Sequence, residues 1–325
     1  MEKLVLIDGN AIIHRAYHAL PKSMSNRKGE LTNAVYGFTT TIIKVLEDLK
    51  PKYIAASFDL AGPTFRHEHF KDYKATRVKA DQELYDQIPR VKEVVEAMEI
   101  PIYEKEGFEA DDCIGTVVEK LKDKEIEIYV VSGDKDIFQL INGKVKVYSL
   151  RKGLSQMQIV DHQTIESEYN LQPADFIDLK ALAGDASDNI PGVPGIGPKT
   201  ATQLLQEFDT LEKLYEAIEG VKNKEQEARI KPRILELLKK YKDQAFMSQK
   251  LATIYRDVPI RFSLEECKWG EYDRSKLRAL FEELGFVSLL RRFDVSGDKS
   301  EIRNSNVETN SKSQIEKKDR QLKLL

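Results

Sequence analysis

The chain has 325 residues, enough for one large or two modest domains, and carries a net charge of −3 with 41% hydrophobic and 32% charged residues. This composition is typical of a globular protein and lacks the overall positive charge that marks many nucleic-acid-binding proteins. Nucleic acid is not thereby excluded, because clusters of both signs cancel in a sum. Two cysteines, Cys113 and Cys267, are too few for a disulfide framework or a zinc site. We expect both to be buried apolar side chains in a reducing compartment.

Membrane and export signals are absent from the sequence pattern. No apolar run approaches the roughly 18 residues that a membrane span requires. The first ten residues, "MEKLVLIDGN", enter an apolar run directly and lack the cleavage pattern of a signal peptide. We therefore expect a cytoplasmic protein with no membrane partner.

The first half of the chain alternates between short apolar runs and helical patterns. Runs of strand length lie at 4–8, 53–59 and 127–134, and the helical patterns between them include 33–50 and 111–124. Unbroken β-branched runs are typical of strands buried on both faces, and their alternation with helices predicts βαβ units. We therefore predict an α/β domain with a mostly parallel sheet over residues 1–170.

Each predicted strand delivers an aspartate to the same edge of the sheet. Asp8 ends the first run, Asp59 the second and Asp134 the third, with Asp136 two residues further on. Ligands of an open parallel sheet bind beyond the carboxyl ends of its strands. These four aspartates are therefore candidates for one site.

Three further acids crowd the start of the predicted helix at 111–124. They are Glu109, Asp111 and Asp112, three acids within four residues. One acid at a helix start has a structural explanation, because aspartate is a preferred N-cap and suits the helix dipole. Three exceed what capping requires, so we add all of them to the candidate site.

So many like charges in one place indicate bound cations. Converging carboxylates raise one another's pKa values and make folding costly unless cations intervene. An all-oxygen, anionic ligand set suits Mg²⁺ or Mn²⁺, whereas zinc would call for histidine or cysteine. Two such ions about 4 Å apart are a common device for in-line displacement at a phosphodiester. The acids therefore predict metal-dependent phosphoryl chemistry, without fixing the substrate.

The segment at 65–80 is locally basic and follows the strand that ends at Asp59. One interpretation is a charged helix face exposed to solvent. The other is that a lysine and an arginine of this segment meet a scissile phosphate while Tyr73 offers a ring on which a base stacks.

From residue 171 the pattern is helical, and we predict a second, helical domain over 171–293. Within it, "GDASDNIPGVPGIGPKTA" (184–201) matches a helix–hairpin–helix. Its glycines let the backbone approach a phosphate, its second helix begins with exposed amides that favour anions, and such a hairpin holds duplex backbone without reading sequence. Asp185 and Asp188 are expected to share a helical face and reach the metal site from this domain. A plain turn between helices is the alternative.

The end of the chain differs in composition from the rest. Residues 294–325 are polar and nearly free of aromatic side chains, so we predict a disordered tail. The helical domain shows no sustained heptad pattern, and we expect a monomer.

Taken in order, these motifs closely resemble the 5′-nuclease family, and most closely its branch of N-terminal 5′→3′ exonuclease domains from bacterial DNA polymerase I. The resemblance runs from "LVLIDGNAIIHRAYHAL" (4–20) to "LGFVSLLRRF" (284–293) and covers roughly residues 1–293. It implies a PIN-like α/β nuclease core, a helical arch at about 65–90 over the active site, and a helix–three-turn–helix domain that binds duplex DNA. It leaves open whether the chain is a free-standing exonuclease or a fragment of a longer polymerase.

The resemblance also implies roles for individual residues. The positions that match the family's acidic metal ligands are Asp8, Asp59, Glu109, Asp111, Asp112, Asp134, Asp136, Asp185 and Asp188, and none is replaced. Those that match basic residues at the scissile phosphate are Lys74, Arg77 and Arg15, and Tyr73 matches the base-stacking position. The hairpin residues Gly192, Gly195, Gly197, Lys199 and Thr200 match the element that binds duplex backbone, with a monovalent cation such as K⁺ on its carbonyls.

We therefore expect a 5′→3′ exonuclease and flap endonuclease that needs divalent metal and no small-molecule cofactor. Its substrates would be branched or nicked DNA and primer RNA during replication and repair at the nucleoid. A PIN-type ribonuclease is an alternative, although a grip on duplex DNA is superfluous for cutting single-stranded RNA. A module that binds DNA junctions without cutting would be expected to lose acids. A phosphatase of the Asp-x-Asp type would carry its second aspartate where Asn10 stands.

Overall fold

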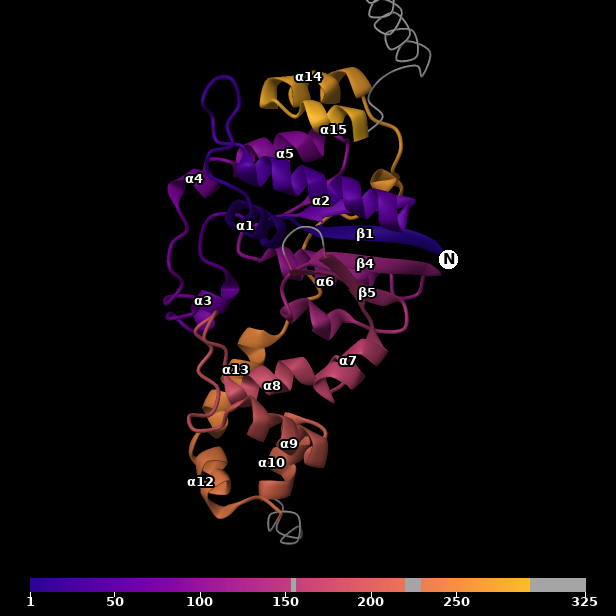
Figure 1. Ribbon diagram of the computed structural model, residues 1–325. Coiled ribbons are helices and arrows are strands. Elements are labelled where there is room, and N and C mark those ends of the chain that lie inside the picture. The colour runs from indigo at the N-terminus through magenta and orange to yellow at the C-terminus, as the bar shows by residue number, and fades with distance from the viewer. Residues whose placement is uncertain (153–155, 220–228, 293–325) are drawn as a thin grey trace, which may run out of the picture.

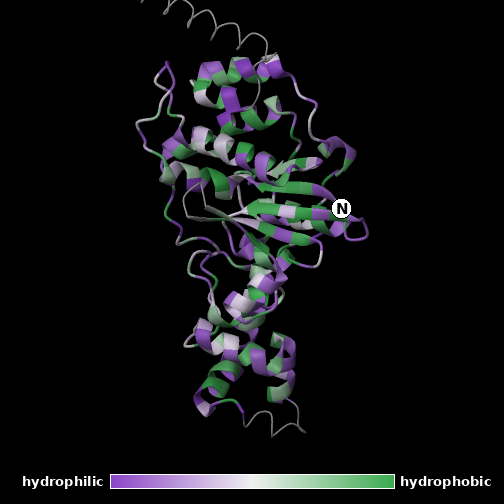
Figure 2. Ribbon diagram, turned by 45° about the vertical axis from the view of Figure 1, so that its right-hand side comes forward, coloured by the Kyte–Doolittle hydropathy of each residue, from purple (hydrophilic) through white to green (hydrophobic). Residues whose placement is uncertain are grey.

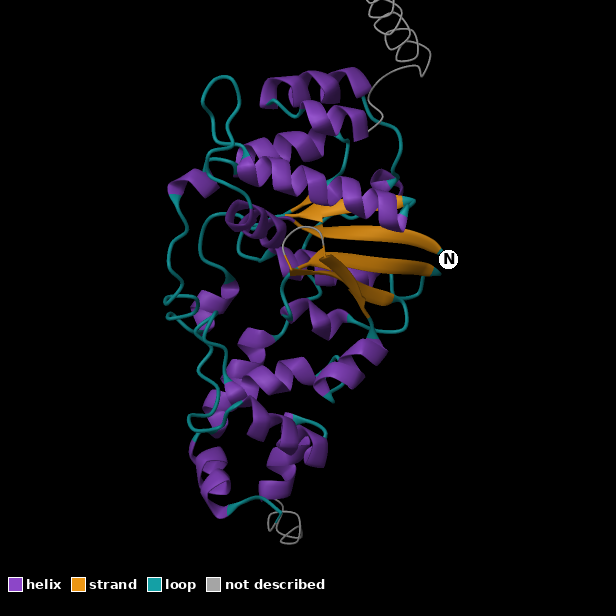
Figure 3. Ribbon diagram, viewed as in Figure 1, coloured by secondary structure: helices purple, strands orange, loops and turns teal. Residues whose placement is uncertain are grey.

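The computed structural model describes residues 1–152, 156–219 and 229–292. One half of the molecule is a sheet covered by helices, and the other half is helical (Figure 1; Figure 3). The predicted tail at 294–325 lies outside the described residues.

Six strands form a single sheet in the order β3-β2-β1-β4-β5-β6. The strands are β1 (Glu2–Asp8), β2 (Tyr53–Ser57), β3 (Ile102–Tyr103), β4 (Ile126–Ser132), β5 (Val145–Lys152) and β6 (Gln156–Val160). All neighbours pair in parallel except β6, which runs antiparallel to β5. The mostly parallel sheet that the sequence predicts is confirmed. The strand order reverses between β1 and β4, and ligands of such sheets bind at this switch point.

The central strands are apolar over most of their length because both faces of the sheet are buried (Figure 2). Along β1, Leu4 and Leu6 belong to one hydrophobic core and Val5 and Ile7 to the other, as the period-two alternation of a strand requires. The first core includes α6 (Ala110–Lys120), and the second includes α1 (Gly9–Ala19), α2 (Asn33–Leu49) and α5 (Ile88–Ala97). Because helices pack on both faces, the position of each strand in the sheet is fixed, and so are the residues at its carboxyl end.

The expected arch at 65–90 contains two short helices joined by irregular chain along one edge of the molecule (Figure 1). These helices are α3 (Phe65–His69) and α4 (Gln82–Tyr85). Two further elements complete the first 170 residues, the 3₁₀ helix η1 (Asp136–Leu140) and α7 (His162–Tyr169).

The chain beyond residue 170 is helical as expected. Its elements are α8 (Asp175–Ala183), α9 (Pro198–Phe208), α10 (Leu211–Glu219), α12 (Pro232–Lys240), α13 (Lys242–Ala252), η2 (Glu265–Cys267), α14 (Arg274–Leu284) and α15 (Val287–Arg292). The last two helices, however, lie at the opposite end of the molecule from α9 and α10 (Figure 1). Leu277 and Phe281 of α14 are buried in the same core as α2 and α5. Helical periodicity predicts that a helix has an apolar face, but it does not predict which element that face packs against. For this reason α14 and α15 are grouped with the other helices in the prediction from the sequence. The division into domains stays a prediction.

Both cysteines are buried free thiols, as expected, and burial raises the pKa of Cys113 to about 12 and that of Cys267 to about 11. In the part of the chain that the structure describes, no helix is both long and apolar enough for a membrane crossing.

A tight glycine contact closes the base of the hairpin. Gly192 has a φ of 59°, and a Cβ there would lie 2.2 Å from the backbone nitrogen of Gly184. We predict that Gly192→Ala lowers the free energy of unfolding in urea by about 2–4 kcal/mol, because the substitution adds both backbone strain and a clash. Gly197→Ala is the matched control, since φ is −96° there and a Cβ meets no described atom within 4 Å. Equal losses in the two variants would contradict this account.

Candidate active site

Three neighbouring strands bring aspartates to the carboxyl edge of the sheet. Asp8 is the last residue of β1, Asp59 follows β2 by two residues and Asp134 follows β4 by two residues. Together with Glu109 and Asp111 at the start of α6, they line a cavity of roughly 240 Å³. These five carboxylates form the first acidic group.

Asp8 is held in place from two sides. As N-cap of α1, its Oδ1 accepts a hydrogen bond from the Ala11 amide at 3.1 Å, and its Oδ2 accepts one from Ser132 Oγ at 2.6 Å. Burial foremost, with the charges of Asp59 and Asp134 added, raises the pKa of this carboxyl to about 7 against these two hydrogen bonds. Asp8 is therefore oriented before any ligand binds and is only partly ionised at neutral pH.

The start of α6 supplies two of these five carboxylates, those of Glu109 and Asp111. Asp59 Oδ1 accepts a hydrogen bond from the Ala110 amide at 2.7 Å, which ties the end of β2 to this helix. Burial raises the pKa of Asp111 well above its ordinary value, and nearby carboxylates, those of Asp8 and Asp134 foremost, raise it further. A divalent cation would relieve this repulsion directly.

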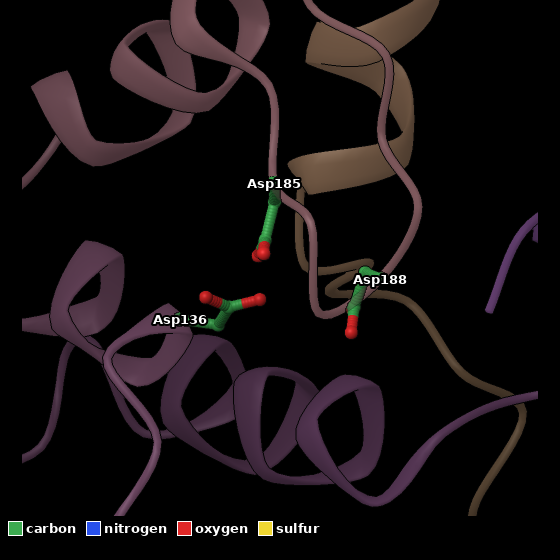
Figure 4. A group of neighbouring side chains, drawn as sticks. All are labelled: Asp136, Asp185 and Asp188. Carbon is green, nitrogen blue, oxygen red and sulfur yellow. The ribbon is translucent and has the colours of Figure 1, made fainter. Parts of the chain in front are cut away.

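A second acidic group lies beside the first. Carboxylate oxygens of Asp136, Asp185 and Asp188 all lie within 4.8 Å of one another (Figure 4). Asp136 and Asp185 line a larger cavity of roughly 770 Å³, and Asp134 lines both cavities. The carboxylates are thus arranged as two adjoining groups that share Asp134.

The expected helical face for Asp185 and Asp188 is wrong. Helix α8 ends at Gly184, where φ is 74°, and the backbones of Asp185 and Ile190 then pair with each other. The two aspartates therefore lie on a tight turn. This turn, and not helical spacing, turns both side chains toward Asp136.

Lys180 was not among the residues that sequence reasoning selected. From the last turn of α8 it donates hydrogen bonds to Asp136 and to Asp185, the latter at 2.5 Å. Burial opposes its charge, but the two carboxylates raise the pKa of Lys180 above its ordinary value. The same lysine lowers the pKa of Asp185 against the effect of burial, whereas burial and Asp134 raise the pKa of Asp136 to about 7 despite it. A sequence signal for Lys180 exists, because it is a lysine at the end of a predicted helix, a few residues before Asp185 and Asp188.

The basic segment folds over both acidic groups. Lys74 Nζ lies 2.6 Å from Glu109 Oε1, and Arg77 Nη2 lies 2.5 Å from Asp188 Oδ1. Tyr73 is only 3% exposed, and its hydroxyl donates to Asp188 at 3.0 Å. The tyrosine ring is therefore not placed to stack on a base in this conformation, because the segment packs it inward. Arg15 lines the larger cavity from α1.

Asp112 lies apart from the other acids. It is completely buried and accepts hydrogen bonds from Arg66 Nη1 and Nη2, both at 2.8 Å. Its oxygens also accept hydrogen bonds from the backbone amides of Glu109, at 3.0 Å, and Tyr255, at 2.8 Å. Both oxygens are thus engaged by Arg66 and by backbone amides, and Asp112 lines neither cavity, so we expect it to hold Arg66 in place of a metal ion.

The hairpin divides into a structural and an exposed part. The Gly192 amide donates to Ser248 Oγ at 3.1 Å, so this glycine serves the packing of the hairpin. The other residues selected from the sequence lie at or near the tip: Gly195, Gly197 and Lys199 are exposed, and Thr200 is half-buried. Helix α9 begins with proline and has no side-chain cap, so its first amides are the part suited to an anion. Pro198 and Thr202 line the larger cavity, which therefore extends from the acids to the hairpin.

Family comparisons agree with this architecture. The family described as "5′-3′ exonuclease, N-terminal resolvase-like domain" matches residues 3–170, and "5′-3′ exonuclease, C-terminal SAM fold" matches residues 171–275. The chain belongs to the 5′-3′ exonuclease family. It is 45% identical over 291 residues to DNA polymerase I of Bacillus subtilis and 41% identical over 300 residues to that of Bacillus caldotenax. These alignments cover 90% and 92% of the chain but 32% and 33% of the relatives, so the chain spans about a third of their length.

Solved structures share the fold of this chain at low sequence identity. The T5 5′-exonuclease with bound divalent zinc ions is 19% identical and aligns over 87% of this chain and 100% of its own, with a TM-score of 0.65. The bacteriophage T5 flap endonuclease in complex with DNA and metal ions is 19% identical over 90% of this chain and 99% of its own, with a TM-score of 0.63. The catalytic core of Rad2 with DNA substrate is 20% identical over 87% of this chain and 88% of its own, with a TM-score of 0.54. These structures therefore share with this chain an α/β core followed by a helical domain.

The raised carboxyl pKa values make stability depend on pH in a defined direction. Asp8 and Asp136 have folded-state pKa values of about 7, so between about pH 4 and pH 7 the folded protein holds protons that the unfolded chain has lost. In EDTA, the free energy of unfolding should therefore fall as the pH rises through this window, by up to about 4 kcal/mol for each of the two groups. Chemical denaturation at several pH values measures it, and Asp8→Asn should flatten the slope. Stability that rises with pH over this range would contradict the assignment.

Two adjacent aspartates should respond oppositely to the same substitution. Asp112→Asn removes the carboxylate that pairs with both Nη atoms of the buried Arg66, leaves only its longer contact with Glu109, and should cost about 3–5 kcal/mol of stability. Asp111→Asn removes a repelled charge and should stabilise the metal-free protein while weakening Mn²⁺ binding. Urea unfolding and Mn²⁺ titration of both variants test this. If folded Asp112→Asn lost as much Mn²⁺ affinity as Asp111→Asn, Asp112 would be a metal ligand after all.

Proposed function

We propose that this chain is a divalent-metal-dependent 5′ nuclease that cuts phosphodiester bonds at 5′ flaps and nicks in DNA. The observation that carries the proposal is the pair of acidic groups sharing Asp134, with Lys74 and Arg77 beside them, in a chain of the 5′-3′ exonuclease family. Its activity on DNA would give 5′-phosphate and 3′-hydroxyl ends.

The donor set fits two hard divalent ions. Both groups offer carboxylate oxygens, which suit Mg²⁺ or Mn²⁺. Burial foremost, and then the charges of neighbouring carboxylates, raise the pKa values of Asp8 and Asp136 to about 7. Asp134 is placed to serve both ions because it lines both cavities. When bound, such ions activate a water molecule and stabilise the charge that develops on the phosphate.

The role of Lys74 and Arg77 in this proposal is electrostatic. Glu109 and Asp188 raise the pKa of Lys74 against its burial, so this amine stays protonated and acts as a cation and not as a general base. Arg77 keeps its charge in the same way beside Asp188. Both would pass from their carboxylate partners to the oxygens of the scissile phosphate, with Arg15 approaching from the larger cavity.

The substrate class follows from the hairpin and from the relatives. The larger cavity reaches the start of α9, where exposed Lys199 and the first amides would hold duplex backbone, with K⁺ on nearby carbonyls. The T5 and Rad2 neighbours were solved with DNA, which supports DNA as the partner. Primer RNA as a further substrate, action as a monomer and a place at the nucleoid belong to this proposal. Base stacking on Tyr73 would require its segment to move away from Asp188.

A cleavage assay tests the function. A 5′-labelled duplex with a single-stranded flap at a nick is incubated with the protein in Mg²⁺ and in EDTA, beside matched single-stranded DNA and RNA. We expect cutting at the junction that depends on Mg²⁺ and is absent from the single strands. Preferred cutting of the RNA would support the ribonuclease alternative, and tight flap binding without cutting would support a binding module.

Lys74 provides a sharper test of the site. We predict that Lys74→Ala lowers the single-turnover rate of flap cleavage by roughly 10²–10³-fold, because the variant lacks a preorganised charge at the phosphate. Lys79→Ala is the matched control, since Lys79 is exposed in the same segment. Wild-type rates in Lys74→Ala would remove this residue from the site.

A further inference from the structure

A separate cavity of roughly 760 Å³ lies where the basic segment begins, outside both acidic groups. Its lining combines aromatic and basic side chains from α3, from the loop before α6 and from the end of α13. They include Phe65, His69, Phe108, Lys250, Tyr255 and Arg256. Neither the metal site nor the hairpin uses any of them.

Three rings line this cavity, and one of them is exposed to solvent. Phe108 and Tyr255 stack with centroids 5.5 Å apart and planes at 28°, and Phe65 packs against both at 5.7 and 5.8 Å. Tyr255 is 42% exposed although it is a large aromatic side chain. Exposed aromatic clusters on a protein surface mark binding sites, and a planar aromatic ligand could extend this stack.

The charges around the rings favour an anionic ligand. Lys250, Arg256 and His69 are exposed at the rim, and none of the described lining residues carries a carboxylate. Arg66 lies beneath, with its guanidinium carbon 4.6 Å from the centroid of the Phe65 ring, and its own charge is balanced by Asp112. A planar ring that carries a phosphate satisfies both features, and this is the chemistry of a nucleotide.

The cavity is rigidly connected to the acidic site. Arg66 lies beside Phe65, pairs with Asp112 and has Nη1 only 3.7 Å from Glu109 Oε2. Asp112 also accepts a hydrogen bond from the Tyr255 amide, and the Phe65 amide donates one to the Gly107 carbonyl at 3.1 Å. One buried ion pair thus forms the wall between the rings and the carboxylates, which places a ligand of the cavity next to the cutting site.

We propose that this cavity binds an unpaired nucleotide of the 5′ flap strand, with its base stacked on Tyr255 and its phosphate beside Lys250 and Arg256. The proposal rests on the flap-nuclease function above and extends it with a site for the displaced strand. It accounts for an exposed aromatic stack beside a nuclease centre.

The test combines two protein variants with two flap strands. Binding is measured by fluorescence anisotropy in Ca²⁺ for a nicked duplex with a six-nucleotide flap, the same flap with abasic sites, and no flap. In the wild type, abasic flaps should bind about tenfold more weakly than normal flaps. Tyr255→Ala should bind the normal flap about tenfold more weakly and be insensitive to abasic sites, while Tyr255→Phe should match the wild type.

Several outcomes decide between this site and its failure. Equal binding of the flapless nick by all proteins shows that the variants are folded and that the duplex grip is intact. If Tyr255→Ala remains as sensitive to abasic sites as the wild type, or if the wild type ignores them, no base binds in the cavity and the proposal is overturned. The proposed function is read separately from wild-type cleavage of the flap in Mg²⁺, so the two failures are distinguishable.

Discussion

Repulsion among carboxylates at one edge of the sheet is the constraint to which the rest of this structure responds. Parallel strands and the start of α6 bring five carboxylates to one small cavity, and a turn after α8 adds a second group beside it. Burial and like charge raise the pKa values of Asp8 and Asp136 to about 7, so the arrangement is costly for the protein alone. Unfavourable free energy from buried, mutually repelling carboxylates is typical of functional sites, where bound cations can offset it.

The protein's own cations already offset part of this charge from outside the sheet. Lys180 joins Asp136 to Asp185, and Lys74 and Arg77 join the basic segment to Glu109 and Asp188. These pairs also connect parts of the chain that are distant in sequence. The basic segment, the α8 turn and the sheet edge are therefore held in one arrangement by these ion pairs.

Local sequence signals were enough to predict the sheet and its acidic edge, because strand length, apolar runs and the residues after each strand are local properties. The direction of individual side chains was not predictable in this way. Asp111 and Asp112 are adjacent, but α6 packs on the sheet through Ile114 and Val117, and this rotation turns one carboxylate to the cavity and the other to Arg66. The burial of Tyr73 likewise depends on tertiary contacts with Leu251 and Ala252 that no local pattern reveals.

The central claim is that the acids form two adjoining cation sites that share Asp134. The most direct measurement is an anomalous difference map from crystals of this chain soaked in Mn²⁺. The account predicts one peak among Asp8, Asp111 and Asp134 and a second one beside Asp136 and Asp185, with none at Asp112. A map without a peak at either group, or with the strongest peak at Asp112, would contradict it.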